Sequence, residues 1–138
     1  MILSLDTNVL IHLVRNRSPA VRERHFQALA DGDEFVASLI VFHELRLGCE
    51  LHPDPVGELA RVAQVLTQVT IEPFDEADMI VTAQVRAKLR RLGKTIGSFD
   101  SLIAGQALAR GWTVVTANTH EFARIDGLNV IDWTAPAD

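Results

Sequence analysis

The chain has 138 residues, 48% hydrophobic and 22% charged, a composition that excludes a disordered or fibrous protein and suffices for a buried core. Its single cysteine, Cys49, rules out an internal disulfide, and the sequence has neither a secretory-signal pattern nor an apolar run near the ~20 residues that span a bilayer. The net charge of −5 argues mildly against a nucleic-acid binder, although the distribution of charge matters more than its total. We therefore expect a cytoplasmic protein without membrane contact, folded as one domain over residues 1–138.

Short apolar runs alternate with segments whose apolar residues recur at helical spacing. In chain order the pattern predicts strand 2–5, helix 7–15, helix 19–30, strand 35–37, helix 40–51, helix 54–65, strand 69–71, helix 75–92, helix 98–110, strand 113–116 and strand 128–131. Ser18 before Pro19, Ser38 and Ser98 are suitable helix caps, and Gly93 is a suitable helix end. Strands alternating with helices indicate a parallel sheet covered on both faces. The predicted fold is a three-layer α/β/α sandwich with a central, mainly parallel five-stranded sheet.

Two acidic residues stand where a charge is unexpected. Asp6 directly follows the first strand, and ligands of parallel sheets gather at the carboxyl ends of strands. Aspartate is also a favoured helix N-cap, so Asp6 has an ordinary structural alternative. Glu44 shares its helix face with apolar residues such as Ile40 and Leu51. A carboxylate in such surroundings needs a partner, which is either a cation or a basic side chain such as Arg46.

Two further acids repeat this pattern. Asp100 shares a helix face with Ile103 and Ala104 and lies in the first helical turn, where the helix dipole offers an alternative explanation for an acid. Glu121 follows the strand at 113–116, and its alternative is a solvated loop acid. These two residues therefore join Asp6 and Glu44 as candidates for one site at the carboxyl edge of the sheet.

Several carboxylates cannot converge as anions without a cation, because their mutual repulsion would raise their pKa values. Oxygen ligands favour a hard ion such as Mg²⁺ or Mn²⁺ over zinc. Such an ion commonly meets phosphate oxygens and activates water. The acids therefore indicate metal-assisted hydrolysis of a phosphodiester.

Four segments carry a family resemblance, in the order and spacing of the PIN domain. They are LDTNVL around Asp6, SLIVFHEL with Glu44, IGSFDSLIAGQAL around Asp100 and VVTANTHEF with Glu121. Over essentially its whole length the chain resembles PIN-domain proteins, and most of all the VapC ribonuclease toxins of bacterial toxin–antitoxin pairs. The resemblance implies a PIN-like fold and a Mg²⁺- or Mn²⁺-dependent endoribonuclease that leaves 5′-phosphate and 3′-hydroxyl ends.

The resemblance also implies roles for individual residues. Asp6 and Asp100 would bind the metal directly, and Glu44 directly or through water. Glu121 would complete the acidic cluster at a position where many relatives have aspartate. Hydrogen-bond support would come from either Thr7 or Asn8, and from Asn118. Ser101 stands where an apolar or acidic residue is frequent, which affects the rim of the site rather than its chemistry. The implied partners are an RNA substrate, with tRNA the first guess, a second copy in a homodimer, and a cognate VapB-type antitoxin whose C-terminal segment occupies the active-site groove.

Basic residues are concentrated in two stretches of this acidic chain. The first immediately precedes IGSFD and can contact RNA phosphates beside the site; it contains Arg86, Lys88, Arg90, Arg91 and Lys94. The second contains Arg15, Arg17, Arg22 and Arg24, interrupted by Glu23. A solvated helix face is the alternative for both. With no tyrosine and 6% aromatic residues, recognition of a folded RNA by its shape and backbone fits better than stacking on single strands.

Two other functions fit parts of the pattern. A PIN nuclease could act in RNA maturation or DNA processing, and a non-enzymatic partner-binding module could keep the fold with a decayed site. The presence of all four acids argues against the decayed site.

Overall fold

Five strands form the central sheet of the computed structural model, which describes residues 1–135. They lie in the order β3–β2–β1–β4–β5, and every neighbouring pair is parallel. The strands are β1 (Ile2–Leu5), β2 (Glu34–Ser38), β3 (Val69–Glu72), β4 (Thr113–Val115) and β5 (Asn129–Ile131). The expected five-stranded sheet is confirmed, and it is wholly rather than mainly parallel.

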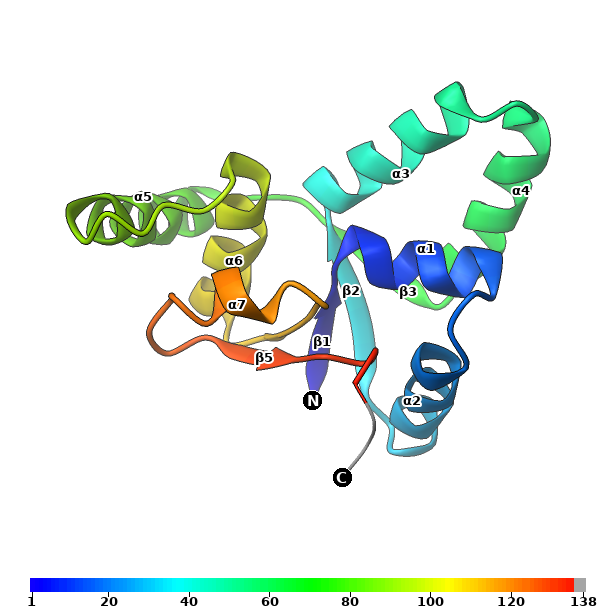
Figure 1. Ribbon diagram of the computed structural model, residues 1–138, viewed down its shortest axis with the longest axis horizontal. Helices are drawn as coiled ribbons and strands as arrows, with labels where there is room; N and C mark the ends of the chain where they lie inside the picture. Colours follow the sequence, from blue (N-terminus) through cyan, green and yellow to red (C-terminus); the bar gives the residue numbers. More distant parts are fainter. Residues whose placement is uncertain (136–138) are drawn as a thin grey trace.

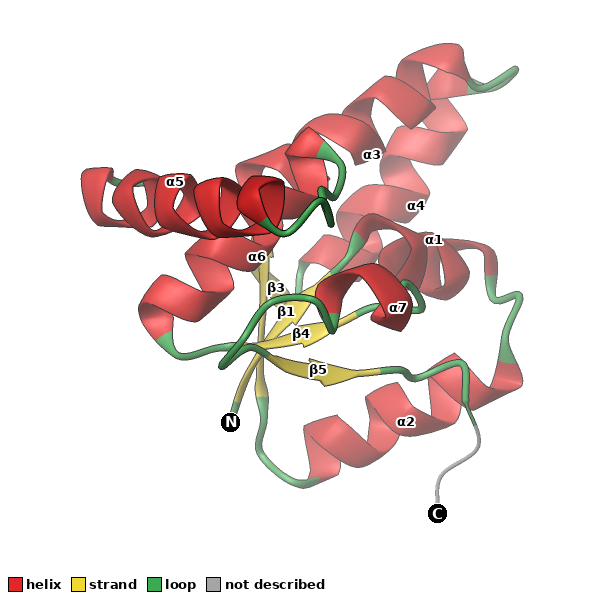
Figure 2. Ribbon diagram, turned by 60° about the vertical axis from the view of Figure 1, so that its left-hand side comes forward, coloured by secondary structure: helices red, strands yellow, loops and turns green. Residues whose placement is uncertain are grey.

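The helices cover both faces of this sheet. They are α1 (Thr7–Arg15), α2 (Pro19–Ala30), α3 (Leu39–Leu51), α4 (Pro55–Leu66), α5 (Glu76–Arg91), α6 (Ser98–Arg110) and α7 (Thr119–Phe122). Figure 1 shows α1 and α2 on one side of the strands and α5 and α6 on the other, while α3 and α4 form a pair that extends away from the sheet. Figure 2 shows the strands enclosed between α6 and α2. The three-layer α/β/α sandwich is therefore confirmed. None of the helices described in residues 1–135 is long and apolar enough to cross a membrane.

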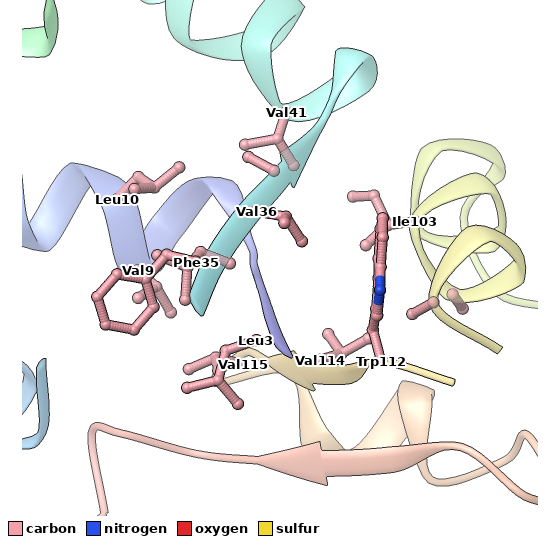
Figure 3. Packing of buried hydrophobic residues seen from close by; sticks show 14 of the residues in the cluster. Leu3, Val9, Leu10, Phe35, Val36, Val41, Ile103, Trp112, Val114 and Val115 are labelled. Atoms are coloured by element: carbon pink, nitrogen blue, oxygen red, sulfur yellow. The ribbon is translucent and has the colours of Figure 1, made fainter. Parts of the chain in front are cut away.

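The core is built around β1, β2 and β4, which are buried on both faces. Phe35 and Val36 are successive residues of β2 and point to opposite faces of the sheet (Figure 3). Val9 of α1 lies on one face and Ile103 of α6 on the other, with Val114 of β4 close to the centre. Strands with two buried faces read as continuous apolar runs, which is why the short runs of the sequence identify them.

Most of the predicted caps are present, and one is wrong. The hydroxyls of Ser18 and Ser38 accept hydrogen bonds from the third residue of α2 and of α3, as expected of N-caps. Ser98, however, is the first residue of α6 rather than its cap. Gly97 is the N-cap, because the Ser101 amide donates to its carbonyl, and no side chain caps this helix.

The short helix α7 is absent from the sequence-based prediction. Four residues are too few for helical periodicity to register, so the segment reads as a loop. Phe122 at its end is fully buried and anchors the turn to the core. This anchor fixes the position of the neighbouring Glu121.

A buried ion pair joins α5 to α6. Asp78 reads from the sequence as an ordinary first-turn acid, yet its side chain is only 1% exposed and accepts two hydrogen bonds from Arg110, at 2.7 and 3.1 Å. Burial alone would raise the pKa of Asp78, but the bonds from Arg110 and the charge of its guanidinium lower the pKa overall. The pair is structural and lies outside the acidic cluster described below.

Candidate active site

The acidic cluster forms where the strand order of the sheet reverses. The chain runs from β1 outward through β2 to β3 and then returns to the other side of β1, where β4 and β5 lie. In parallel sheets the crevice beyond the carboxyl ends of the strands at such a point is the usual ligand site. Asp6 follows β1 and Thr116 follows β4, and the Asp6 amide donates to the Val115 carbonyl at 3.0 Å.

Both carboxylate oxygens of Asp6 are held in place. Oδ1 accepts a hydrogen bond from the Thr7 amide at 2.7 Å, and Oδ2 accepts one from the Thr116 hydroxyl at 2.7 Å. Asp6 is 7% exposed, so these bonds fix a largely desolvated carboxylate. Asp6 is therefore the N-cap of α1, the ordinary role that the sequence also allowed for it. Only one of its oxygens, however, accepts a hydrogen bond from the helix backbone. Each oxygen keeps free acceptor capacity for another ligand.

Glu44 reaches the same place from α3. Its Oε1 accepts a hydrogen bond from the Thr7 hydroxyl at 2.9 Å, so Thr7 connects the first two acids. The alternative salt bridge to Arg46 is not formed. The Arg46 guanidinium lies instead over the Phe42 ring, 5.9 Å from its centroid. Glu44 thus forms no salt bridge with a basic side chain among residues 1–135.

Asn118 connects the other two acids. Its Nδ2 donates to Asp100 Oδ2 at 3.3 Å and to Glu121 Oε2 at 3.0 Å. The backbone amide of Asn118 donates in turn to the Thr116 hydroxyl at 3.0 Å, and this same hydroxyl donates to Asp6. A chain of hydrogen bonds therefore runs from Asp6 through Thr116 and Asn118 to Asp100 and Glu121.

The supporting residues differ partly from those expected. Thr7 and Asn118 make side-chain contacts with the acids, whereas Asn8 is exposed and forms no side-chain hydrogen bond within the described residues. Thr116 is fully buried and central to the network, and sequence reasoning treated it only as the end of a strand. Thr116 occupies after β4 the place that Asp6 occupies after β1, but this equivalence is apparent only once the strand order is known.

The four carboxylates influence one another electrostatically. The pKa of Asp100 is raised from 3.8 to about 6, first by burial and then by the negative charges of Asp6 and Glu121, by a hydrogen bond with Glu121, and by the charge of Glu44. An acid with such a pKa sits among charges that are not compensated. This is the electrostatic condition that a bound cation relieves.

The donor chemistry of the cluster fits a hard divalent cation. All four candidate ligands offer carboxylate oxygens, the type preferred by Mg²⁺ and Mn²⁺. Within residues 1–135, no three His, Cys, Asp or Glu side chains already form a group arranged to hold a metal ion. The oxygens of Asp6 and Glu44 are instead turned toward the hydroxyls and amides that hold them.

The structure separates the basic residues of the first stretch. Arg86 and Arg90 line a hollow together with Thr95 and Ser101, beside the first turn of α6. Lys88 lies on another side of α5 and forms an ion pair with Asp126. The remaining two are exposed to solvent, namely Arg91 and Lys94. Only Arg86 and Arg90 are thus placed beside the helix turn that carries an acid of the cluster.

Comparison with known proteins gives a consistent result. The family model of the PIN domain matches residues 3–128. The tRNA(fMet)-specific endonuclease VapC of Shigella flexneri is 38% identical over 130 residues, covering 94% of this chain and 96% of the relative. Ribonuclease VapC1 of Haemophilus influenzae is 33% identical over 135 residues, with 97% and 99% coverage.

Solved structures agree with these sequence relatives. A DNA-bound VapBC from Salmonella typhimurium matches with a TM-score of 0.87 at 35% identity, covering 96% of this chain and 98% of that chain. VapBC2 from Rickettsia felis, bound to a promoter DNA fragment, matches with a TM-score of 0.88 at 28% identity, with 96% and 99% coverage. In each comparison the similarity therefore extends over nearly the full length of this chain and of the chain it matches. The chain belongs to the PIN-domain family, among its VapC ribonucleases.

Proposed function

We propose that this protein is a divalent-metal-dependent endoribonuclease that cleaves a folded RNA and serves as the toxin of a toxin–antitoxin pair. The observation that carries the proposal is the cluster of four carboxylates at the carboxyl ends of β1 and β4, within which burial and neighbouring charges raise the pKa of Asp100 to about 6. Ribonucleases of the PIN domain generally depend on divalent metal, and these oxygens suit that requirement.

Asp6, Glu44 and Asp100 are the proposed ligands of Mg²⁺ or Mn²⁺, with Glu121 at the edge of the set. The bound ion would supply a water of lowered pKa and neutralise charge on the phosphoryl oxygens. The chain's own residues prepare this chemistry. Thr116 and Thr7 hold Asp6 and Glu44 in fixed orientations, so these side chains lose little conformational entropy when the substrate binds.

Asn118 has a comparable role on the other side of the cluster. Its side-chain amide donates to both Asp100 and Glu121 and keeps these two mutually repelling carboxylates in place. Asp100 carries a proton for part of the time near pH 6 and is anionic at higher pH, the form that binds a cation. Hydrolysis at such a site is proposed to leave 5′-phosphate and 3′-hydroxyl ends.

The proposed substrate is a tRNA, and initiator tRNA is the first candidate. The support is the name of the relatives from Shigella flexneri and Salmonella typhimurium, which are tRNA(fMet)-specific endonucleases. A VapB-type antitoxin is the proposed inhibitor, because the structural relatives include VapBC assemblies. A homodimer is proposed from family resemblance.

The decisive experiment incubates the purified protein with total RNA and Mg²⁺ or Mn²⁺ and maps the new 5′ ends by sequencing. We expect a few discrete cuts, with 5′-phosphate ends, that disappear in EDTA and in Glu44→Gln. Glu50→Gln is the matched control, since Glu50 is an exposed acid on the same helix and should leave cleavage unchanged. Cleavage that persists in both EDTA and Asp100→Asn would overturn the metal mechanism. Cleavage of DNA but not RNA would favour the DNA-processing alternative.

A further inference from the structure

Two adjoining hollows lie at the end of α1 that is farther from the acidic cluster. The first, of about 480 Å³, is bounded by α1, α2 and α4 and is lined by Arg22 and Arg61, among others. The second lies beside it and is lined by Arg15, Arg17 and again Arg61. The two hollows share Val14 as well as Arg61, so they form one continuous surface.

This surface is strongly basic on an acidic protein. We call it the α1–α4 basic surface and define it by Arg15, Arg17, Arg22 and Arg61. Among residues 1–135, Glu58 is the only acid that lines either hollow. The lining residues that the structure describes therefore carry a net formal charge of +3, whereas the whole chain carries −5. The segregation of charge is therefore much sharper in the folded protein than along the sequence.

Glu58 organises this surface rather than neutralising it. It is 4% exposed, and its carboxylate contacts Arg15 Nη2 at 3.4 Å, Arg61 Nε at 3.1 Å and His52 Nε2 at 3.4 Å. Burial by itself would raise the pKa of Glu58, but the hydrogen bond from Arg61, the charges of His52 and Arg61 and the bond from Arg15 lower it overall. One buried anion thus positions two guanidinium groups that come from different helices.

The other two arginines are not paired with an acidic side chain that the structure describes. Among residues 1–135, Arg17 and Arg22 form no ion pair with a carboxylate, and Arg22 donates only to the neutral amide oxygen of Asn16. Both side chains are exposed. They are available to an anionic ligand without first breaking a salt bridge.

The basic surface is continuous with the acidic cluster. Glu44 of α3 and Arg15 of α1 line the same small hollow, to which α1 also contributes Ile11. Thr7, which bonds Glu44, lies eight residues before Arg15, and at about 1.5 Å per helical residue the two are about 12 Å apart along α1. A ligand lying along α1 can therefore contact both regions.

We propose that the α1–α4 basic surface binds the sugar–phosphate backbone of the RNA substrate, away from the bond that is cleaved. The inference rests on the proposed ribonuclease function. A cluster of carboxylates repels a polyanion, so the affinity for RNA has to come from elsewhere on the protein. Arginines that neutralise phosphates supply such affinity without reading sequence. A folded RNA such as tRNA offers backbone over a wide area, which suits a second contact at this distance.

The test measures binding of a fluorescent initiator-tRNA transcript to the full chain in EDTA, where cleavage is blocked, over a range of salt concentrations. The doubly substituted variant Arg17→Ala/Arg22→Ala should bind about tenfold more weakly near 0.1 M salt, and the slope of log K against log salt should fall by about 2. Arg17→Lys/Arg22→Lys should restore most of the affinity, because a phosphate contact depends on charge. Arg24→Ala is the matched control. Arg24 lies on α2 with Arg22, but it lines neither hollow and donates to the Ala135 carbonyl.

The possible outcomes are distinguishable. Unchanged affinity and salt slope in the alanine variant, with a wild-type protein that binds and cleaves RNA, would overturn the inference and leave the ribonuclease function standing. A wild-type protein that neither binds nor cleaves RNA would overturn both. If the alanine variant keeps its RNA affinity but loses affinity for the cognate antitoxin, the surface belongs to the protein partner and the inference is wrong. Circular dichroism of each variant verifies that the fold is retained.

Discussion

Replacing Asp100 by asparagine should stabilise the metal-free protein at neutral pH, although it removes a residue of the active site. The pKa of Asp100 is raised from 3.8 to about 6 by burial and by its acidic neighbours. Between these two pH values the folded state holds the proton more tightly than the unfolded chain. The free energy of unfolding therefore falls as pH rises through this window. Asparagine keeps the shape and the acceptor for Asn118 but carries no charge.

The size of the effect follows from the pKa difference. A shift of this extent corresponds to at most about 3 kcal/mol, at about 1.4 kcal/mol per pKa unit. Because Asp100 is only partly buried, solvent screening reduces the expected gain to about 1–2 kcal/mol. For a chain of this length that gain is about 4–8 °C in melting temperature.

Thermal denaturation in EDTA, followed by circular dichroism, measures this difference. Asp100→Asn should melt above the wild type near pH 7.5, and the gap should narrow as the pH is lowered from about 6 toward 4. Adding Mn²⁺ at about ten times its Kd should raise the wild-type stability by about 1.4 kcal/mol and the variant much less. A variant that melts below the wild type in EDTA near pH 7.5, or a gap that does not depend on pH, would refute the electrostatic reasoning.

Four further substitutions test the supporting structure. Thr116→Val removes the hydroxyl that donates to the acidic cluster, so kcat for RNA cleavage should fall about 10- to 100-fold in a variant whose circular dichroism is unchanged. Arg110→Met leaves the buried Asp78 carboxylate without its partner and should cost about 3–5 kcal/mol in urea unfolding; an effect below about 1 kcal/mol would contradict the buried pair. Ser38→Ala should cost about 1 kcal/mol through loss of a cap, whereas Ser98→Ala should change stability by less than about 0.5 kcal/mol, and equal losses would speak against Gly97 as the cap of α6.

The candidate site was largely predictable because its residues stand out locally. Asp6 follows a strand, and Glu44 lies on an apolar helix face. Asp100 likewise lies on an apolar helix face, and Glu121 follows the strand predicted at 113–116. Thr116 was missed because a threonine at a strand end has no unusual property until Asp6 is seen beside it. A hydrogen bond between residues 110 positions apart leaves no mark on either local pattern.

The basic surface illustrates the opposite case. The sequence places Arg15, Arg17 and Arg22 in one stretch, but it gives no reason to add Arg61, which is contributed by a different helix. Glu58 looks like any acid of a helical first turn until the fold buries it among these side chains. Which charges are paired and which are free depends on distances between helices, and no periodicity encodes those distances.

The sequence by itself therefore determined the strands, the longer helices, the layered fold class and the candidate acids. Strand and helix patterns are local, and a carboxylate in apolar surroundings is conspicuous in a single segment. Only the tertiary structure decided the strand order that places Asp6 beside Thr116, the raised pKa of Asp100, and the grouping of arginines from α1, α2 and α4. These properties depend on burial and on charges a few ångströms apart in space, and both arise only when segments distant in the chain are packed together.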